Sequence, residues 1–337
     1  MDASNHHEHQ QNRPRRSGLT LVLRDIALLI VALNTFAVFH HVLPMKLTPA
    51  GSKSTLAAVA GSDAPMQSPD PLDAIAVGAP AEAPVATPAP GDFSATFPAE
   101  DTGKDALYRY QTDTVRLAID KIQADGVTCF LADVYIKNID ALQTAFAKGT
   151  YGKSIYEFPA KTAVANGAVF AVTGDYYSAR SKGVVVRNGE LYRDVPSDDV
   201  CVLYRSGEMK TYTNETLDLS NFDSQNIWQA WSFGPALLTA DGEKISEFTS
   251  DLNDRHPRCG IGYYAPGHYC FLVVDGRQKG YSIGVRLSEF SDLFAKLGCK
   301  QAYNLDGGAT AIMIFKGEVI NKPYKGGRES GDIIYFK

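Results

Sequence analysis

Residues 44–100 constrain the fold most, because their composition is not that of a chain that builds a core. This segment holds ten of the seventeen prolines, and no Phe, Trp or Tyr stands between Phe39 and Phe93. Such a segment buries too little apolar surface to offset its ordering entropy. We expect residues 44–104 to be a disordered, partly extended spacer. Residues 105–337 are then left for a single folded domain.

An apolar run from Ile26 to Leu43 precedes the spacer and is broken by few polar residues. About 18–20 apolar residues span a bilayer core, and no small-residue cleavage site of a secretory signal follows. Four arginines between residues 13 and 24 place residues 1–25 in the cytoplasm by the positive-inside rule. We therefore predict a single-pass signal anchor at residues 26–43 in the cell membrane, with residues 105–337 extracytoplasmic.

The domain that follows has the texture of a β-rich protein. Val115, Leu117 and Ile119 alternate with polar residues, as strands do when one face is buried. Further strands are expected at Val127–Ile136, Ala163–Val172, Val184–Arg187, Val200–Tyr204, Tyr269–Val274, Ala311–Phe315 and Ile333–Phe336. The strands do not alternate strictly with helices. We therefore predict the α+β class, as one β-rich domain with mostly antiparallel strands and a few helices.

Helical periodicity is found in two places. Ile139, Leu142 and Phe146 would form one apolar face. Phe290, Leu293, Phe294 and Leu297 would form another, in a helix that begins at the N-cap Ser288 and ends at Gly298.

Net charge and cysteine content exclude few classes of function. The net charge is −5, and no basic stripe with interleaved aromatics occurs, which argues against a nucleic-acid partner. The five cysteines show no zinc-site spacing, and we favour buried thiols over a disulfide framework. We expect His256 and His268 to lie in loops and assign neither as a catalytic base.

The last thirty-four residues hold the densest group of candidate site residues. Asp306 precedes the pair Gly307 and Gly308, and a second glycine pair precedes Arg328 and Glu329. Glycine lets backbone N–H groups approach a ligand closely, because it has no Cβ. A carboxylate beside one pair and an arginine beside the other suit a site for an anionic, oxygen-rich substrate. Either glycine pair could equally serve only a tight turn.

The order of these residues resembles the C-terminal signature of the phosphodiester glycosidase family, which includes N-acetylglucosamine-1-phosphodiester α-N-acetylglucosaminidases. The segments that carry the resemblance are Asn304–Gly308 (NLDGG), Gly326–Ile333 (GGRESGDI), Arg255–Gly262 (RHPRCGIG) and Asp275–Gly284 (DGRQKGYSIG). Phe233–Leu238 and Gly174–Tyr177 match weaker family positions. The resemblance covers roughly residues 105–337 and is dense from about residue 228 onward.

The resemblance implies a hydrolase that releases a sugar from a phosphate-linked aglycone by cleaving a glycosyl-1-phosphodiester. Glycoside hydrolysis usually needs two carboxylates, although stabilising the charge of a phosphate leaving group could replace much of the acid's role. Asp306 is the first choice for a catalytic carboxylate, with Asp175 or Glu329 as its partner. Each aspartate could instead cap a turn.

Substrate contacts are expected from the same segments. Arginine binds phosphate with a planar fork, but any one arginine here could instead be a surface or ion-paired residue. Tyr176 and Tyr177 could stack on a sugar, or one of them could belong to the core. The candidates for binding substrate or phosphate are Arg258, Arg277, Arg328, Asn304, Gly307, Gly308, Thr310, Asp275 and Tyr177.

Two departures from the family pattern leave the substrate open. Ala309, Thr310 and Ala311 stand where the family has another glycine and serines, and Thr173 replaces an asparagine. Asn304 and Asp306 offer oxygen ligands of the kind that calcium takes, but the sequence establishes neither a metal nor another cofactor.

The leading hypothesis is a membrane-anchored, extracytoplasmic hydrolase of glycosyl phosphodiesters that acts on cell-envelope polysaccharide or its fragments. The alternative is a non-catalytic glycan-binding or scaffold protein of exopolysaccharide or cell-wall assembly. The joint presence of Asp306, Arg258 and Arg328 favours the enzyme. A purely structural tethered domain, the third possibility, would have no anion pocket.

Overall fold

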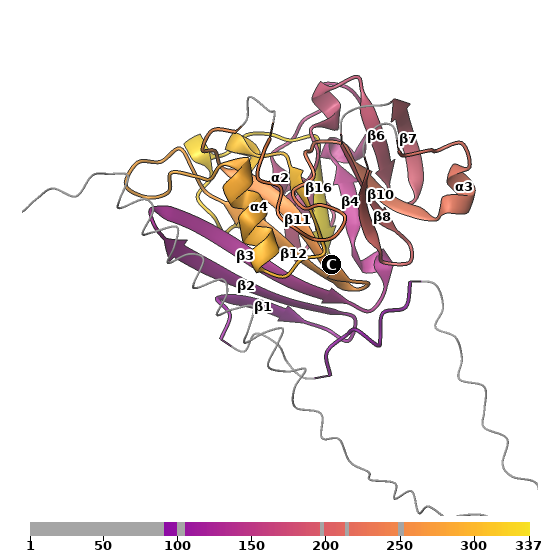
Figure 1. The fold of residues 1–337 in the computed structure, drawn as a ribbon, viewed down its shortest axis with the longest axis horizontal. Helices are drawn as coiled ribbons and strands as arrows, with labels where there is room; N and C mark the ends of the chain where they lie inside the picture. Colours follow the sequence, from indigo (N-terminus) through magenta and orange to yellow (C-terminus); the bar gives the residue numbers. More distant parts are fainter. Residues whose placement is uncertain (1–90, 100–104, 196–198, 213–215, 249–252) are drawn as a thin grey trace, which may run out of the picture.

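The structure is a computed structural model that describes residues 91–99, 105–195, 199–212, 216–248 and 253–337 (Figure 1). The expected membrane anchor at residues 26–43 lies outside these residues, as does most of the expected spacer. None of the helices in the described part of the chain is long and apolar enough to span a bilayer.

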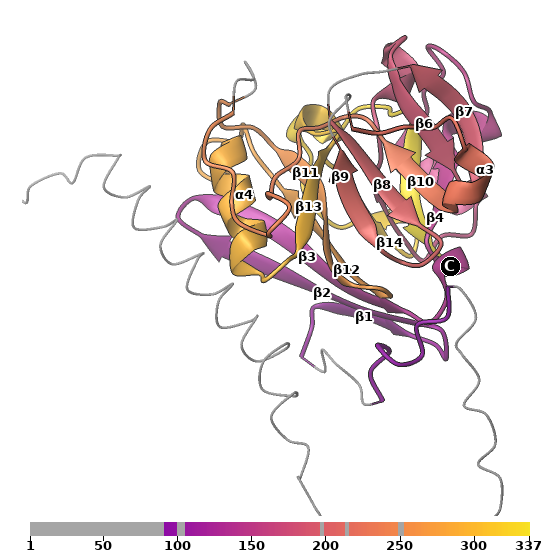
Figure 2. The ribbon, with the colours of Figure 1, turned by 45° about the vertical axis from the view of Figure 1, so that its right-hand side comes forward.

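Three antiparallel sheets build the domain (Figures 1 and 2). The first sheet has the order β1 (Tyr108–Gln111), β2 (Val115–Ala124), β3 (Val127–Ile136), β12 (His268–Val274), β11 (Arg258–Ala265), β13 (Gln301–Leu305). The second has the order β7 (Glu190–Val195), β6 (Gly183–Arg187), β10 (Ile227–Trp231), β8 (Val200–Tyr204), β9 (Met209–Tyr212). The third has the order β15 (Glu318–Val319), β14 (Met313–Phe315), β5 (Phe170–Thr173), β16 (Asp332–Phe336), β4 (Gln143–Phe146).

Three α-helices accompany the described strands, namely α2 (Pro159–Ala165), α3 (Phe222–Gln225) and α4 (Leu287–Lys296). The sequence thus predicted the class correctly, as an α+β domain with antiparallel strands and few helices.

The first sheet is covered on both faces. All ten residues of β3 are buried, which explains why apolar residues occupy both faces of the strand; its buried Asp133 is paired with His268. On one face, Leu131 and Leu272 lie in a cluster with Phe290 and Phe294 of α4. The opposite face forms the main core with the other two sheets, through residues that include Phe130, Phe271, Val172, Phe336, Leu203 and Trp231.

The predicted helix at residues 288–298 is confirmed as α4, although it begins earlier than expected. Its N-cap is Arg286 and not Ser288, because Glu289 accepts a hydrogen bond of 2.9 Å from the Arg286 backbone N–H. Gly298 ends the helix with a φ of +79°, the left-handed conformation that glycine adopts readily.

Two other element predictions were wrong. Residues 139–146 form a 3-10 turn, Ile139–Ala141, followed by strand β4, and not a helix. The pairing of β4 with β16 determines this conformation. The strand expected at Ala163–Val172 is instead the end of α2, a turn, and β5, because Pro159 starts a helix well.

Cysteine and histidine placements are also clear. All five cysteines are buried and none forms a disulfide, as favoured from the sequence. In the β11–β12 pair, Cys270 lies opposite Gly262, whereas Cys259 lies opposite Val273. The two cysteines are therefore not cross-strand partners. His268 is not a loop residue. It lies within β12, where its Nε2 is 2.8 Å from Asp133 Oδ1.

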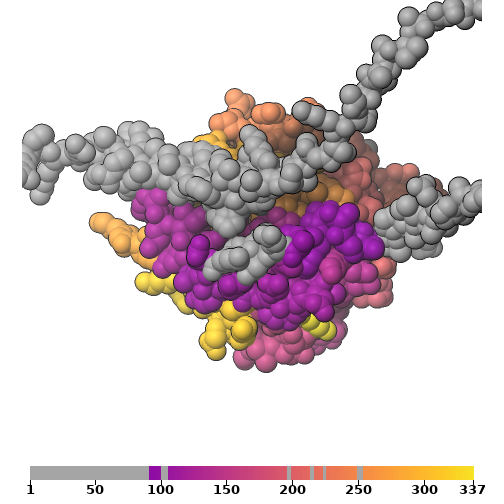
Figure 3. Space-filling view, turned by 90° about the horizontal axis from the view of Figure 1, so that it is seen from below, coloured from indigo at the N-terminus to yellow at the C-terminus, as the bar shows by residue number. Residues whose placement is uncertain are grey.

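The domain also includes residues ahead of the boundary expected at 104/105. Phe93 is 4% exposed and belongs to the main core. A Cβ on Gly207 or Gly267 would lie within 2.5 Å of the Phe93 side chain, which shows how closely it is packed. Figure 3 shows the indigo and purple residues of this segment and of the first strands together on one face of the molecule.

Candidate active site

Segments far apart in the sequence meet at one cavity. β13 ends at Leu305 and continues through Asp306 into the 3-10 turn Gly308–Thr310. Cys259 is opposite Leu305 in the antiparallel β11–β13 pair, so Arg258 and Asp306 lie at the same end of the two strands. The cavity has a volume of about 200 Å³ and is lined by Phe233, His256, Arg258, Arg277, Asn304, Leu305, Asp306, Gly307, Gly308, Ala309 and Arg328.

Asp306 is the carboxylate among the described residues that line this cavity. It is 4% exposed, and its backbone N–H donates to the Gly174 carbonyl oxygen at 3.0 Å. Its Oδ2 has no hydrogen-bond partner among the described residues, and Arg328 Nη2 lies 3.8 Å away. Burial raises the pKa of Asp306 to about 7, against the opposing effects of Thr310 and Arg328. Its carboxyl group can therefore exchange a proton near neutral pH.

Asn304 contributes a second buried oxygen without a partner. Its Nδ2 donates to the Gly234 carbonyl oxygen at 2.7 Å, which fixes the orientation of the amide. Its Oδ1 has no hydrogen-bond partner in the described part of the chain. Buried polar atoms are nearly always paired, so two unpaired oxygens on residues that line one cavity indicate a place for ligand donors.

The three predicted arginines all line the cavity, but they are held differently. Arg258 is buried, and its guanidinium donates to the backbone oxygens of Val285 at 3.3 Å and Asp254 at 3.0 Å. Burial, together with the neighbouring Arg277, lowers the pKa of Arg258 to about 10, so it stays charged at neutral pH. Arg277 follows β12 with a φ of +58°. The Arg328 side chain is 52% exposed at the cavity rim.

The first glycine pair is required by packing as well as by the turn. A Cβ on Gly307 would lie 2.9 Å from the Pro257 carbonyl oxygen, and the N–H of Gly308 donates to that same oxygen at 2.9 Å. Gly308 has a φ of +63°. The Thr310 hydroxyl donates to the Gly307 carbonyl oxygen and closes the turn. These contacts fix Asp306 against the start of β11.

Two aromatic side chains, Tyr176 and Phe233, lie beside the charged residues. Their rings are 6.4 Å apart in an edge arrangement. The Arg328 guanidinium lies 5.7 Å from the Tyr176 ring, and that of Arg180 lies 5.2 Å from the Phe233 ring. Both rings are half-buried, which leaves surface for a sugar. Tyr177 is only 1% exposed and belongs to the interior.

Asp175 is brought close to Asp306 in the structure but is used internally. Its Oδ2 accepts from the Ser232 backbone N–H at 2.8 Å and lies 3.4 Å from Arg187 Nη2. Arg187 Nη2 is also 2.8 Å from Asp332 Oδ2. The Asp175 backbone N–H in turn donates to Asp332 Oδ1 at 2.7 Å. We call Asp175, Arg187 and Asp332 the buried ion network. It holds the turn after β5, whose Gly174 oxygen anchors Asp306.

Arg187 and Asp332 were not among the predicted site residues. Each nevertheless leaves a signal in the sequence, because Arg187 ends the fully buried run of β6 and an arginine in such a run needs a buried anion. Asp332 lies inside the GGRESGDI segment.

The other predicted carboxylates do not line the cavity. Asp275 accepts from the Tyr281 hydroxyl at 2.8 Å, from Asn321 Nδ2 at 2.8 Å and from the Lys322 backbone N–H at 3.0 Å. These bonds tie the loop after β12 to the C-terminal segment. Glu329 is exposed next to Arg328.

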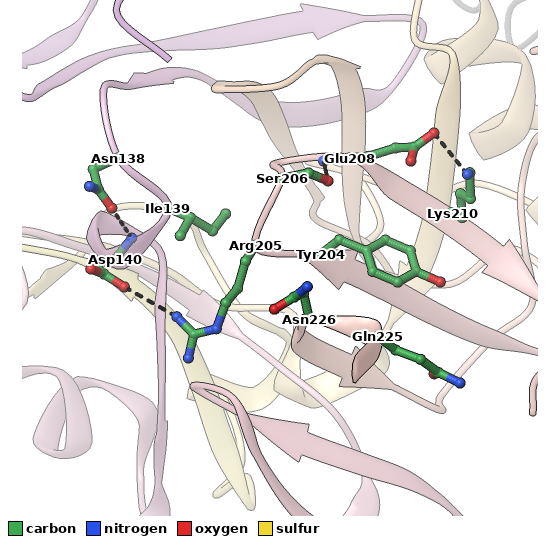
Figure 4. Close-up of a pocket in the computed structure, with 10 residues that line it drawn as sticks. All are labelled: Asn138, Ile139, Asp140, Tyr204, Arg205, Ser206, Glu208, Lys210, Gln225 and Asn226. Atoms are coloured by element: carbon green, nitrogen blue, oxygen red, sulfur yellow. Dashed lines mark hydrogen bonds and ion pairs between the residues drawn. The ribbon is translucent and has the colours of Figure 1, made fainter. Parts of the chain in front are cut away.

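A second and larger hollow, of about 440 Å³, lies around the β8–β9 turn (Figure 4). Its charges are matched within it, because Arg205 is 3.9 Å from Asp140 and Lys210 is 2.9 Å from Glu208. The Asp306 cavity differs from it in having three guanidinium groups, one carboxyl group and two unpaired buried oxygens. We therefore take the smaller cavity as the candidate active site.

The cavity favours an anion over a calcium ion. Calcium takes six to eight oxygen ligands, and the cavity offers Asn304 Oδ1 and Asp306 Oδ2 beside three positive groups. Within the described ranges, no group of three or more His, Cys, Asp or Glu residues could hold a metal.

Together, the fold and the cavity define an α+β domain with an arginine-lined cavity built around one buried carboxyl group. The chain belongs to the phosphodiester glycosidase family, whose sequence profile matches residues 166–337. The resemblance seen in the sequence is thereby confirmed.

Individual proteins are similar to this chain to different extents. The SPβ prophage-derived uncharacterized protein YomE of Bacillus subtilis (strain 168) is 31% identical over 146 residues, covering 41% of this chain and 22% of that protein. The chain therefore spans about a fifth of that relative's length. The zebrafish N-acetylglucosamine-1-phosphodiester α-N-acetylglucosaminidase catalytic domain, auto-inhibited by its pro-peptide, shares the fold with a TM-score of 0.54. It is 16% identical, and the match covers 68% of this chain and 86% of that one.

A hypothetical protein from Synechocystis is also similar, with a TM-score of 0.47, 13% identity, and coverage of 68% of this chain and 64% of that chain.

Proposed function

We propose that this domain hydrolyses glycosyl-1-phosphodiesters, with Asp306 as its catalytic carboxyl group. The observation that carries the proposal is the buried Oδ2 of Asp306, which has no hydrogen-bond partner among the described residues and lies in a cavity lined by three arginines. A binding module for glycans gains nothing from burying such a carboxyl group, because burying its charged form costs stability. An enzyme gains a group that exchanges protons near neutral pH.

In the proposed reaction, the bond between the anomeric carbon and the phosphate oxygen breaks, and both bonding electrons stay with the phosphate. Negative charge therefore develops on the leaving phosphomonoester. Arg277 and Arg328 lie where they can stabilise this charge, and Arg258 adds a fixed positive charge behind them. Water supplies the hydroxyl group of the released sugar, and ionised Asp306 accepts its proton.

The sugar is proposed to lie against Tyr176 and Phe233. Their half-buried rings adjoin Arg328 and Asp306, and aromatic faces suit the apolar face of a pyranose. Asn304 Oδ1 would accept a hydrogen bond from a sugar hydroxyl, which gives this buried oxygen a partner.

The cellular setting is proposed from the sequence alone. We propose that residues 26–43 anchor the chain in the cell membrane, with the domain outside the cytoplasm, and that the substrate is cell-envelope polysaccharide or a fragment of it. The predicted lack of a nucleic-acid partner is kept in this proposal, since the cavity suits a small sugar phosphate.

The decisive experiment measures free sugar released by the full chain from α-GlcNAc-1-phosphodiesters and from related sugar-1-phosphodiesters. Asp306→Asn should lower kcat/KM by about 10²- to 10⁴-fold, the usual effect of losing an acid–base group. Asp292→Asn removes a carboxylate from the middle of α4, where it pairs with Lys244 and Lys296, and should leave kcat/KM unchanged. Binding of these substrates without turnover would instead support the glycan-binding alternative.

A further inference from the structure

His256 lies in contact with one of the arginines of the cavity. Its Nδ1 is 3.2 Å from Arg277 Nε and 3.1 Å from Arg277 Nη2. A guanidinium group only donates hydrogen bonds, so Nδ1 must be the acceptor. The imidazole is therefore neutral, and its proton is on Nε2.

The backbone around His256 leaves it little freedom. Its N–H donates to the Val285 oxygen, and the Val285 N–H donates to the His256 oxygen, both at 3.1 Å. A Cβ on Gly284 would lie 2.5 Å from the His256 oxygen, and one on Gly276 would lie 3.0 Å from the His256 carbonyl carbon. Two glycines thus allow the loop after β12 to approach His256 closely, which fixes the base of its side chain.

Arg277 is held from several sides. Its backbone has a φ of +58°, a conformation that non-glycine residues adopt rarely and that is often kept at functional sites. Its guanidinium lies 5.7 Å from the Tyr324 ring. A Cβ built on Gly308 would lie 3.5 Å from Arg277 Nη1, so the guanidinium reaches the turn that follows Asp306.

The charges around His256 keep it neutral. Burial lowers its pKa below the usual value, and so do Arg277 and Arg258. Asp254 opposes them from the preceding loop. The cavity adds Asp306 and Arg328.

We infer that His256 is a positioning residue, which holds Arg277 over the Gly307–Gly308 turn so that its guanidinium is already oriented when an anion enters the cavity. This inference rests on the proposed function for the identity of the anion as a phosphodiester. The cost of ordering a long, flexible side chain is then met during folding rather than on binding. His256 acts through Arg277 and not as an acid or a base.

The test uses sulfate as the probe, because it keeps its two charges between about pH 5 and 8. Its affinity for the full chain is measured by calorimetry at pH 8 with native protein, His256→Ala and His256→Asn. Asparagine can place Oδ1 where Nδ1 was, and it does not titrate. We expect Ala to weaken binding about tenfold and Asn to stay within about threefold of the native protein.

A double-mutant cycle with Arg277→Ala shows whether the effect passes through Arg277. In that background, His256→Ala should change sulfate affinity less than twofold, because there is no guanidinium left to orient. Additive losses would show that His256 contacts the anion itself and would overturn the inference. So would a His256→Ala protein that binds as tightly as the native one.

The same measurements separate this inference from the proposed function. If the native chain bound no sulfate, the anion site would be overturned, and the proposed function with it. Sulfate binding without coupling between His256 and Arg277 would overturn only the positioning role. The thermal unfolding midpoint of each variant should stay close to that of the native chain. This control is needed because a loss of folding would weaken sulfate binding with or without Arg277.

Discussion

At the scale of single residues, some side chains of the site line the cavity, and others hold those side chains in place. Asp306 and Arg328 line the cavity, whereas Asp175 satisfies Ser232 and Arg187 in the interior. The sequence gives both aspartates the same appearance, an acid beside a glycine. Their roles differ because their partners come from distant segments, which no local pattern reveals.

Asp306→Asn should raise stability at neutral and alkaline pH while lowering activity. The folded-state pKa of about 7 lies above the usual 3.8, so the folded protein binds this proton more tightly than the unfolded chain. Stability is thus lost as pH rises between these two values. Urea unfolding should show nearly equal stability of the two proteins at pH 4, and a gain of the order of 1–4 kcal/mol for Asn at pH 8. A variant less stable than the native protein at pH 8 would contradict the proposed burial cost.

The activity of the native enzyme should rise with pH through about 7, because proton acceptance requires ionised Asp306. The measurement is the pH dependence of kcat/KM. A profile that falls with rising pH through this range would instead assign Asp306 as the proton donor.

Arg187→Met should be strongly destabilising, because it leaves Asp175 and Asp332 buried without their cation. Breaking a buried ion pair by removing one partner costs about 3–5 kcal/mol. Arg205→Met, at an arginine whose side chain is 42% exposed, should cost less than about 1 kcal/mol. Equal losses in chemical denaturation would argue against the network as a structural joint.

At the scale of elements, local pattern predicted best where one element has one apolar face. The heptad-like spacing of Phe290, Leu293 and Phe294 gave α4 correctly, since those side chains cover the first sheet. Helical periodicity at residues 139–146 gave a wrong prediction, because the strand conformation of β4 is determined by its pairing with β16 near the C-terminus. Strand pairing over such separations overrides weak helical periodicity.

Gly262→Ala tests the contact between α4 and the first sheet. A Cβ there would lie 2.7 Å from the sulfurs of both Cys270 and Cys299, and 2.9 Å from Phe294. Overpacking of this kind costs about 1–3 kcal/mol. Adding Cys299→Ala to Gly262→Ala should recover part of the loss in thermal or urea unfolding, because it removes one of the two sulfurs. No recovery would place the strain elsewhere.

At the scale of the whole molecule, the sequence predicted the class and the antiparallel strands but not the three-sheet arrangement. The cavity itself was largely predictable, because the family-like segments carry Asn304, Asp306, Arg258, Arg277 and Arg328 to one place. The contacts that hold each of these residues were not predictable. They depend on backbone oxygens and on close packing of loops that only the assembled sheets bring together.

Phe93→Ala tests whether residues ahead of β1 are part of the domain. Removing a buried phenylalanine costs about 3–5 kcal/mol. Phe97→Ala, the same change four residues later at a partly exposed ring, should cost less than about 1.5 kcal/mol. Similar unfolding midpoints for the two variants would show that residues 91–99 are not part of the core.

The buried ion network joins β6 of the second sheet to β16 of the third, and it does so beneath the turn that holds Asp306. Tyr176, Phe233 and Arg328, by contrast, lie on connecting segments at the cavity's edge. Substitutions at these edge residues can therefore be accepted in evolution without disturbing the Asp306 carboxyl group. If the proposed function holds, relatives of this chain are expected to differ in the sugars they accept through changes in these edge residues, while the proposed reaction stays the same.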